Sequence, residues 1–174
     1  VRPGSAWALV TGAGSGIGRC YALRLAALGY RLVIVGNNAA PLEAVAGEIR
    51  RAARATASAS FPEVRVMPMD LARVGAAQEL HDRTAAEGIE IDVVINNAGI
   101  FSFCDILTTP AERIERIILL HDLTVTQLCR LFAADMVRRG VRGHILNMSS
   151  YSLWMPFPGL ALYSACLLYT SDAA

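Results

Sequence analysis

Short apolar runs alternate with longer amphipathic stretches along most of this chain. Each run is four or five residues long and is bounded by glycine, proline or polar residues, as buried strands of a parallel sheet are. The runs predict strands at 6–10, 31–35, 64–67, 91–95 and 144–148. Between them, apolar residues recur every three or four positions and predict helices at 17–28, 39–55, 74–87 and 110–139, the last with or without an internal break. This alternation predicts an α/β fold with a doubly wound parallel sheet, a three-layer α/β/α Rossmann architecture.

Glycines crowd the junction between the first strand and the first helix. Residues 11–18 read T-G-A-G-S-G-I-G. Glycine permits positive φ and lets a ligand approach the backbone closely, while the N–H groups of a helix's first turn favour a phosphate. The pattern predicts a dinucleotide pyrophosphate site. For this motif alone, a plain structural loop or the glycine-rich turn of a methyltransferase remains the alternative.

Small or polar residues follow four of the predicted strands. They are found at 36–38, at Asp70, at 96–99 and at 149–150. Ligands of doubly wound sheets bind at the carboxyl ends of the strands. The sequence therefore places a binding site along this edge of the sheet.

Composition limits the classes of partner. The chain has 174 residues, 54% of them hydrophobic and 18% charged, and a net charge of +1, which argues against nucleic acid as a partner. No apolar run appears long enough to span a bilayer and no signal peptide is visible, so we expect a cytoplasmic protein without a membrane partner. The four cysteines show neither C-x-x-C nor metal-site spacing, which predicts free thiols and no metal site.

Five segments in order and spacing resemble the short-chain dehydrogenase/reductase family. They are the glycine motif, the lone Asp70, N-N-A-G at 96–99, N-M-S-S at 147–150 and Y-S-A at 163–165, and they cover residues 6–165. The resemblance implies an NAD(P)-dependent oxidoreductase that transfers a hydride between nicotinamide and a ketone or secondary alcohol. It implies that Ser150 polarises the substrate carbonyl and that Tyr163 exchanges the proton. A hydroxyl pair suits this chemistry because charge develops on the carbonyl oxygen.

The same resemblance implies the cofactor site, in which Asp70 would contact the adenine. The implied cofactor-binding residues are Gly12, Ser15, Gly16, Ile17, Gly18, Asn37, Asp70, Leu71, Asn97, Ala98 and Gly99. No acid follows the second strand, which favours NADP, with NAD as the alternative. Arg19, one residue past the glycine motif, is the nearby cation.

Asp122 and a group of apolar residues are further candidates. Asp122 falls where the family often has an Asn that holds a water in the proton relay, but a solvated helix residue is the alternative. The apolar residues surround the expected mouth of the site and favour an apolar carbonyl or alcohol substrate, unless they only pack the closing helix. They are Phe101, Phe103, Leu153, Trp154, Met155, Phe157 and Leu160. A homo-oligomer built through the long helices, as in many family members, is an open expectation.

Position 167 departs from the family, because Leu167 stands where the family has the Lys of Tyr-x-x-x-Lys. An unperturbed tyrosine has a pKa of about 10, and in the family the ammonium group of this Lys helps to lower the pKa of the catalytic tyrosine. The stretch 166–174 resembles the translation of a sequencing adapter. We therefore expect 1–165 to be an incomplete Rossmann domain that lacks its C-terminal strands, 166–174 to be a non-native tail, and this fragment to be inactive. A nucleotide-binding pseudoenzyme that lost the Lys is the rival hypothesis.

Overall fold

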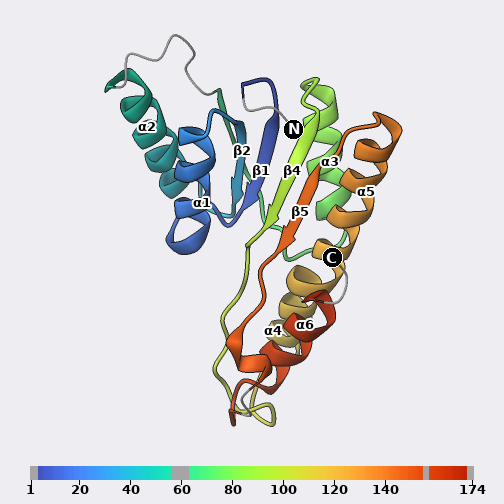
Figure 1. Cartoon of the computed structure of the whole chain (residues 1–174). Coiled ribbons are helices and arrows are strands. Elements are labelled where there is room, and N and C mark those ends of the chain that lie inside the picture. Colours follow the sequence, from blue (N-terminus) through green and yellow to red (C-terminus); the bar gives the residue numbers. More distant parts are fainter. Residues whose placement is uncertain (1–3, 56–62, 155–156, 172–174) are drawn as a thin grey trace.

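The structure, a computed structural model, describes residues 4–55, 63–154 and 157–171. Met155 and the last three residues of the predicted tail therefore lie outside the described residues. Five parallel strands form one sheet in the order β3-β2-β1-β4-β5, which is a doubly wound arrangement (Figure 1). The strands are β1 Trp7–Thr11, β2 Arg31–Gly36, β3 Val64–Pro68, β4 Ile91–Asn96 and β5 His144–Asn147. The predicted fold class is confirmed, and each strand lies within one or two residues of its prediction.

Helices cover both faces of this sheet. Those that cover it are α1 Gly16–Ala27, α2 Ala39–Ala55, α3 Ala76–Ala86 and α5 Val125–Arg138, whereas α4 Ala111–Ile118 and α6 Ala161–Ser171 lie beyond the carboxyl ends of the strands (Figure 1). A π-helical segment η1, Leu119–Thr124, joins α4 to α5, and a short 3-10 helix η2, Tyr151–Leu153, precedes α6. The predicted helix at 110–139 is thus one helix with a π-helical break. The helix predicted from Val74 begins at Ala76, since Gly75 takes a left-handed φ of 80° before it.

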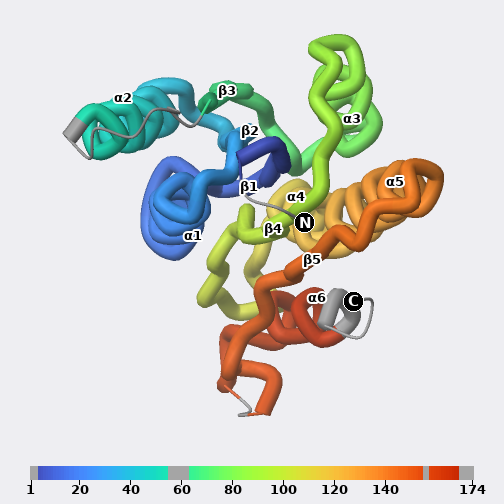
Figure 2. The backbone as a smooth tube through the Cα atoms, turned by 45° about the horizontal axis from the view of Figure 1, so that its top comes forward, coloured from blue at the N-terminus to red at the C-terminus, as the bar shows by residue number. Residues whose placement is uncertain are grey.

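Alternating residues of the central strand feed two separate cores. Ala8 and Val10 of β1 pack with residues of α1 and α2 on one face, whereas Trp7 and Leu9 pack with residues of α3 and α5 on the other. Side chains of a strand alternate between faces, so a fully buried strand is apolar at every position. Viewed along the sheet, α1 and α2 lie on the opposite side from α3 and α5 (Figure 2). This three-layer packing exposes the carboxyl ends of the strands at one edge.

The segment Ala111–Arg138 is long and apolar enough to cross a membrane by length and composition alone. This differs from the expectation above, because Asp122 and Arg130 divide the apolar part of the segment into shorter runs. Core helices of soluble proteins pass the same test. In this fold Ile117, Leu128 and Phe132 of the segment are buried in the protein, the last two against the sheet.

Candidate functional site

The glycine turn after β1 leaves room and donors for an anion. Gly12 and Gly16 take positive φ values of 66° and 52°, and a Cβ on Gly16 would meet no atom within 4 Å. Ser15 is the N-cap of α1, but its side chain makes no capping hydrogen bond. The first-turn N–H groups therefore stay available at the positive end of the helix, which favours a phosphate.

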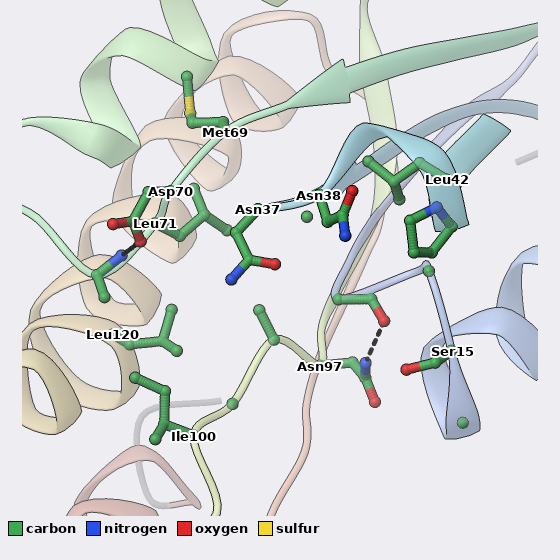
Figure 3. Close-up of a pocket in the computed structure, with 18 of the residues that line it drawn as sticks. Ser15, Asn37, Asn38, Leu42, Met69, Asp70, Leu71, Asn97, Ile100 and Leu120 are labelled. Atoms are coloured by element: carbon green, nitrogen blue, oxygen red, sulfur yellow. Dashed lines mark hydrogen bonds between the residues drawn. The ribbon is translucent and has the colours of Figure 1, made fainter.

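The turn is tied to the N-N-A-G segment that follows β4. The Thr11 hydroxyl oxygen accepts hydrogen bonds from the N–H groups of Asn97 (3.0 Å) and Ala98 (2.9 Å). The Asn97 amide donates to the carbonyl oxygens of Thr11 (3.0 Å) and Gly12 (3.3 Å), the latter bond drawn in Figure 3. These bonds fix two strand ends next to each other and hold the ligand-facing backbone in place.

A cavity of about 450 Å³, here called the main cavity, runs along the strand ends (Figure 3). Ten of the eleven predicted cofactor-binding residues line it, which brings together segments from four strand ends and one helix start. The exception, Gly18, lies behind the turn, where a Cβ would sit 2.3 Å from the Gly12 carbonyl oxygen and 2.4 Å from the Asn97 amide nitrogen. Gly18 thus permits close packing of helix and strand rather than ligand contact. The lining residues that the sequence analysis missed are Gly14, Gly36, Asn38, Pro41, Leu42, Met69, Ala72, Ile100, Arg116 and Leu120.

Asp70 lies at the far end of the main cavity from the glycine turn and carries an ion pair. Its Oδ1 accepts from the Ala72 N–H at 2.9 Å, and its carboxylate lies 3.1 Å from Nη1 of Arg116 on α4. The Ala72 N–H, and then the Arg116 guanidinium, hold the pKa of Asp70 below its usual range. Asp70 is therefore a fixed anion that faces the cavity.

The cation that follows the glycine motif, Arg19, is engaged elsewhere. Arg19 makes a forked ion pair with Glu48 of α2, with Nη2 to Oε1 at 2.6 Å, and it does not line the main cavity. Asn38 accepts from the Ala40 N–H at 3.1 Å and so caps the start of α2. Asn37, in contrast, points into the cavity (Figure 3).

A second, small cavity of about 50 Å³, here called the tyrosine cavity, adjoins the first. Its wall includes Tyr163 and Leu167 of α6 together with His121 of η1, and it shares Asn97, Ala98 and Gly99 with the main cavity. The described residues that line it are Asn96, Asn97, Ala98, Gly99, His121, Val125, Asn147, Met148, Ser149, Tyr163 and Leu167. The two cavities therefore meet at the N-N-A-G segment.

Tyr163 is held between two other rings. Its ring centroid lies 5.3 Å from that of Phe101 and 5.5 Å from that of His121, both edge-on. Burial raises the pKa of the Tyr163 phenol and lowers the pKa of the His121 imidazole, so both groups are neutral near neutral pH. Leu167 is buried beside them and brings no charge.

Ser150 caps the short helix η2 and does not line the tyrosine cavity; its neighbour Ser149 does. The Ser150 hydroxyl oxygen accepts from the Ser152 N–H at 3.1 Å and lies 3.0 Å from the Ser152 hydroxyl. The Ser152 hydroxyl lies 3.1 Å from that of Ser164, the residue after Tyr163. A chain of three hydroxyl groups thus connects Ser150 to Ser164, which is the neighbour of Tyr163 in α6.

Asp122 is half-buried in η1 rather than fully solvated, and its role in a proton relay stays a prediction. Its Oδ1 is buried and has no hydrogen-bond partner among the described residues. Burial raises the pKa of Asp122, whereas a hydrogen bond with the Cys166 thiol opposes that rise. The carboxyl group thus belongs to the interior behind Tyr163, next to the start of the predicted tail.

The predicted apolar cluster divides into two parts. Phe101, Phe103 and Trp154 are largely exposed and lie near α6, as residues at the mouth of a site would. Leu160 is buried, which fits packing of α6. Packing of α6 is thus observed for Leu160, whereas a role of the exposed aromatic residues in substrate binding stays a prediction.

The four cysteines are free, as predicted, and no group of three or more metal-ligating side chains occurs in the described part of the chain.

A parallel sheet with a glycine turn and a long cavity across its strand ends defines a Rossmann-type nucleotide-binding protein. A family model described as short chain dehydrogenase matches residues 6–166. The chain belongs to the short-chain dehydrogenase/reductase family.

Individual relatives agree with this membership. The chain is 36% identical over 175 residues to the "Probable oxidoreductase EphD" of Mycobacterium tuberculosis, with 95% of the chain and 28% of that protein covered. It is 32% identical over 176 residues to the "Very-long-chain 3-oxoacyl-CoA reductase" of Ajellomyces capsulatus, with 98% and 50% covered. A solved short-chain dehydrogenase from Sphingobium yanoikuyae in complex with NADPH matches with a TM-score of 0.83 and 32% identity, over 95% of this chain and 61% of that one. The chain thus spans half or less of these curated relatives.

Proposed function

We propose that this chain carries the cofactor site and proton donor of an NADP-dependent reductase of apolar ketones. The observation that carries the proposal is the meeting of the two cavities at Asn97, Ala98 and Gly99. A dinucleotide with its pyrophosphate at the glycine turn would place its other end beside Tyr163. The glycine turn, with space for a Cβ at Gly16 and uncapped first-turn N–H groups, fits such a cofactor.

The nicotinamide cofactor would supply the hydride, and the residues of this chain would supply the rest. Tyr163, whose pKa is raised by burial, stays protonated and can give a proton to the carbonyl oxygen during reduction. The family resemblance assigns a second hydroxyl donor to Ser150, whose oxygen accepts from the Ser152 N–H; because Ser150 lies outside the lining of the tyrosine cavity, this role requires its hydroxyl to turn toward the substrate oxygen. Phe101 and Trp154 favour an apolar substrate.

The preference for NADP rests on the end of β2. No acid there would repel a 2′-phosphate, and Asn37 offers an amide donor to the main cavity. The solved relative in complex with NADPH supports the same choice. Arg19 takes no part in this argument because Glu48 holds it.

A nucleotide-binding pseudoenzyme is the second candidate, and the buried Leu167 favours it. Without a cation at this position, nothing among the residues lining the tyrosine cavity would lower the pKa of Tyr163. On this hypothesis the chain binds the cofactor and acts by sensing or interaction.

Titration of the chain with NADPH and NADH, followed by a ketone-reduction assay, tests both candidates. We expect saturable binding that is tighter for NADPH and is lost in Gly18→Ala, whose Cβ would collide with the glycine turn. Gly47→Ala is the control, because Gly47 is also a helical glycine without positive φ, and its Cβ would meet only the end of Arg51, at 3.4 Å, away from the main cavity. Binding without turnover in this chain does not separate the candidates, because the chain spans half or less of its curated relatives. Binding without turnover in a Leu167→Lys chimera that also carries the C-terminal part of one of these relatives would favour the pseudoenzyme. Absence of binding would refute both candidates.

A further inference from the structure

One ion pair stands inside the main cavity. Among the described residues that line it, Arg116 is the sole cation and Asp70 the sole anion. The Arg116 guanidinium approaches Asp70 with two nitrogens, Nη1 at 3.1 Å from Oδ2 and Nη2 at 3.3 Å from Oδ1. Both side chains are nearly half exposed, and pairs of this kind contribute little to stability. The main consequence of the contact is therefore the orientation of the carboxylate.

The contacts of the carboxylate leave little freedom. An ionised carboxylate has about four acceptor sites. Two bonds reach Oδ1, from the Ala72 N–H at 2.9 Å and from Arg116, and one reaches Oδ2, again from Arg116. One acceptor site on Oδ2 remains. The backbone beside it is also fixed, because the Thr124 hydroxyl donates to the Leu71 carbonyl at 2.8 Å.

We propose that Arg116 is a positioning residue that makes Asp70 select the base of the cofactor. The inference rests on the dinucleotide site proposed above. A fixed acceptor suits the 6-amino group of adenine and repels the 6-carbonyl oxygen of hypoxanthine. Without the guanidinium, only the Ala72 N–H holds the carboxylate, so Oδ2 can turn toward water and this discrimination weakens.

The cation that follows the glycine motif does not position Asp70. Arg19 lies outside the lining of the main cavity and is bound by Glu48. A general attraction of Arg116 for the phosphates of the cofactor would act on every dinucleotide alike. Two dinucleotides that differ only in this base have the same phosphates. A change in the ratio of their affinities therefore shows that Arg116 positions Asp70, whereas an equal change in both affinities shows attraction to phosphate.

The test compares the binding of NADPH with that of its hypoxanthine analogue, by fluorescence titration of the chain. A hydrogen bond to a charged group corresponds to a preference of about tenfold for adenine. We expect Arg116→Gln to reduce this preference to about twofold, and Arg116→Lys, which keeps the charge but not the fork, to keep part of it. The double variant Asp70→Asn with Arg116→Gln should show no greater loss of the preference for adenine than Asp70→Asn alone, since both changes break the same contact.

Arg113→Gln is the matched control, because it removes a positive charge from the same helix but lies outside the lining of the main cavity. It should leave the preference for adenine unchanged. Equal weakening of both dinucleotides in Arg116→Gln, or an unchanged ratio, would overturn the inference while leaving the proposed cofactor site intact. Failure of the unaltered chain to bind either dinucleotide would overturn both.

Discussion

The His121 imidazole stands edge-on to the Tyr163 phenol, with ring centroids 5.5 Å apart and planes at 86°. Nε2 of His121 accepts a hydrogen bond from the Ile100 N–H at 2.9 Å. One ring thus connects the loop after β4 to the helix that carries the candidate proton donor. Because burial lowers its pKa, His121 is a neutral packing element of the tyrosine cavity.

Gly99→Ala tests how tightly this ring packs. A Cβ on Gly99 would lie 2.8 Å from Cε1 of the buried His121 ring, so something must shift. We expect a loss of about 1–3 kcal/mol in the free energy of unfolding, as for other overpacked sites, and weaker NADPH binding. Chemical denaturation and cofactor titration measure the two effects.

Gly47→Ala, in the middle of α2, is the matched control. A Cβ there would meet only the flexible end of Arg51, at 3.4 Å. Alanine should therefore stabilise the helix, by up to about 1 kcal/mol. If Gly99→Ala proved as stable as Gly47→Ala, the close packing of His121 would be refuted.

Leu167→Lys tests the role of charge beside Tyr163. Both residues line the tyrosine cavity, and burial alone raises the pKa of Tyr163. An ammonium group there favours the phenolate, so the pKa of Tyr163 should fall, and ketone reduction should increase. The phenolate absorbance during a pH titration, with the Tyr163→Phe variant subtracted, gives the pKa.

Leu167→Met keeps the size and neutrality of the side chain and serves as the control for this titration. It should leave the pKa of Tyr163 where it is. A folded Leu167→Lys variant with an unchanged Tyr163 titration would show that position 167 does not reach the phenol.

The elements and most of the predicted lining of the main cavity could be predicted because their signals are local. Apolar runs mark the strands, and the glycine turn and N-N-A-G need particular residues at fixed spacing. Arg116 and the packing of His121 beneath Gly99 could not be predicted. Both depend on how the helix from α4 to α5 is rotated over the sheet, which the π-helical segment alters. The pairing of Arg19 with Glu48 joins two helices and likewise has no local signal.

Arg139→Ala tests a structural ion pair far from the cavities. The Asp92 carboxylate lies 2.9 Å from Nη1 of Arg139 and accepts from the Trp7 N–H at 3.3 Å, and both charged side chains are largely buried. Removal of Arg139 leaves a buried carboxylate without its cation, so we expect a loss of about 3 kcal/mol in stability. Arg138→Ala, which breaks an exposed pair, should cost about 1 kcal/mol or less in the same denaturation experiment. Equal effects would contradict this difference in burial.

Asp122→Asn should change how stability depends on pH. Burial raises the pKa of Asp122 in the folded chain above the unfolded value of about 3.9. The folded state therefore favours the protonated carboxyl group: its stabilising contribution is complete below about pH 3.9 and is lost as pH rises through the folded pKa. The amide of Asn cannot ionise, so the variant should be more stable than the unaltered chain near pH 7, and this gain should disappear near about pH 4. Urea denaturation at the two pH values measures the difference, and a gain of equal size at both would show that ionisation of Asp122 has no part in it.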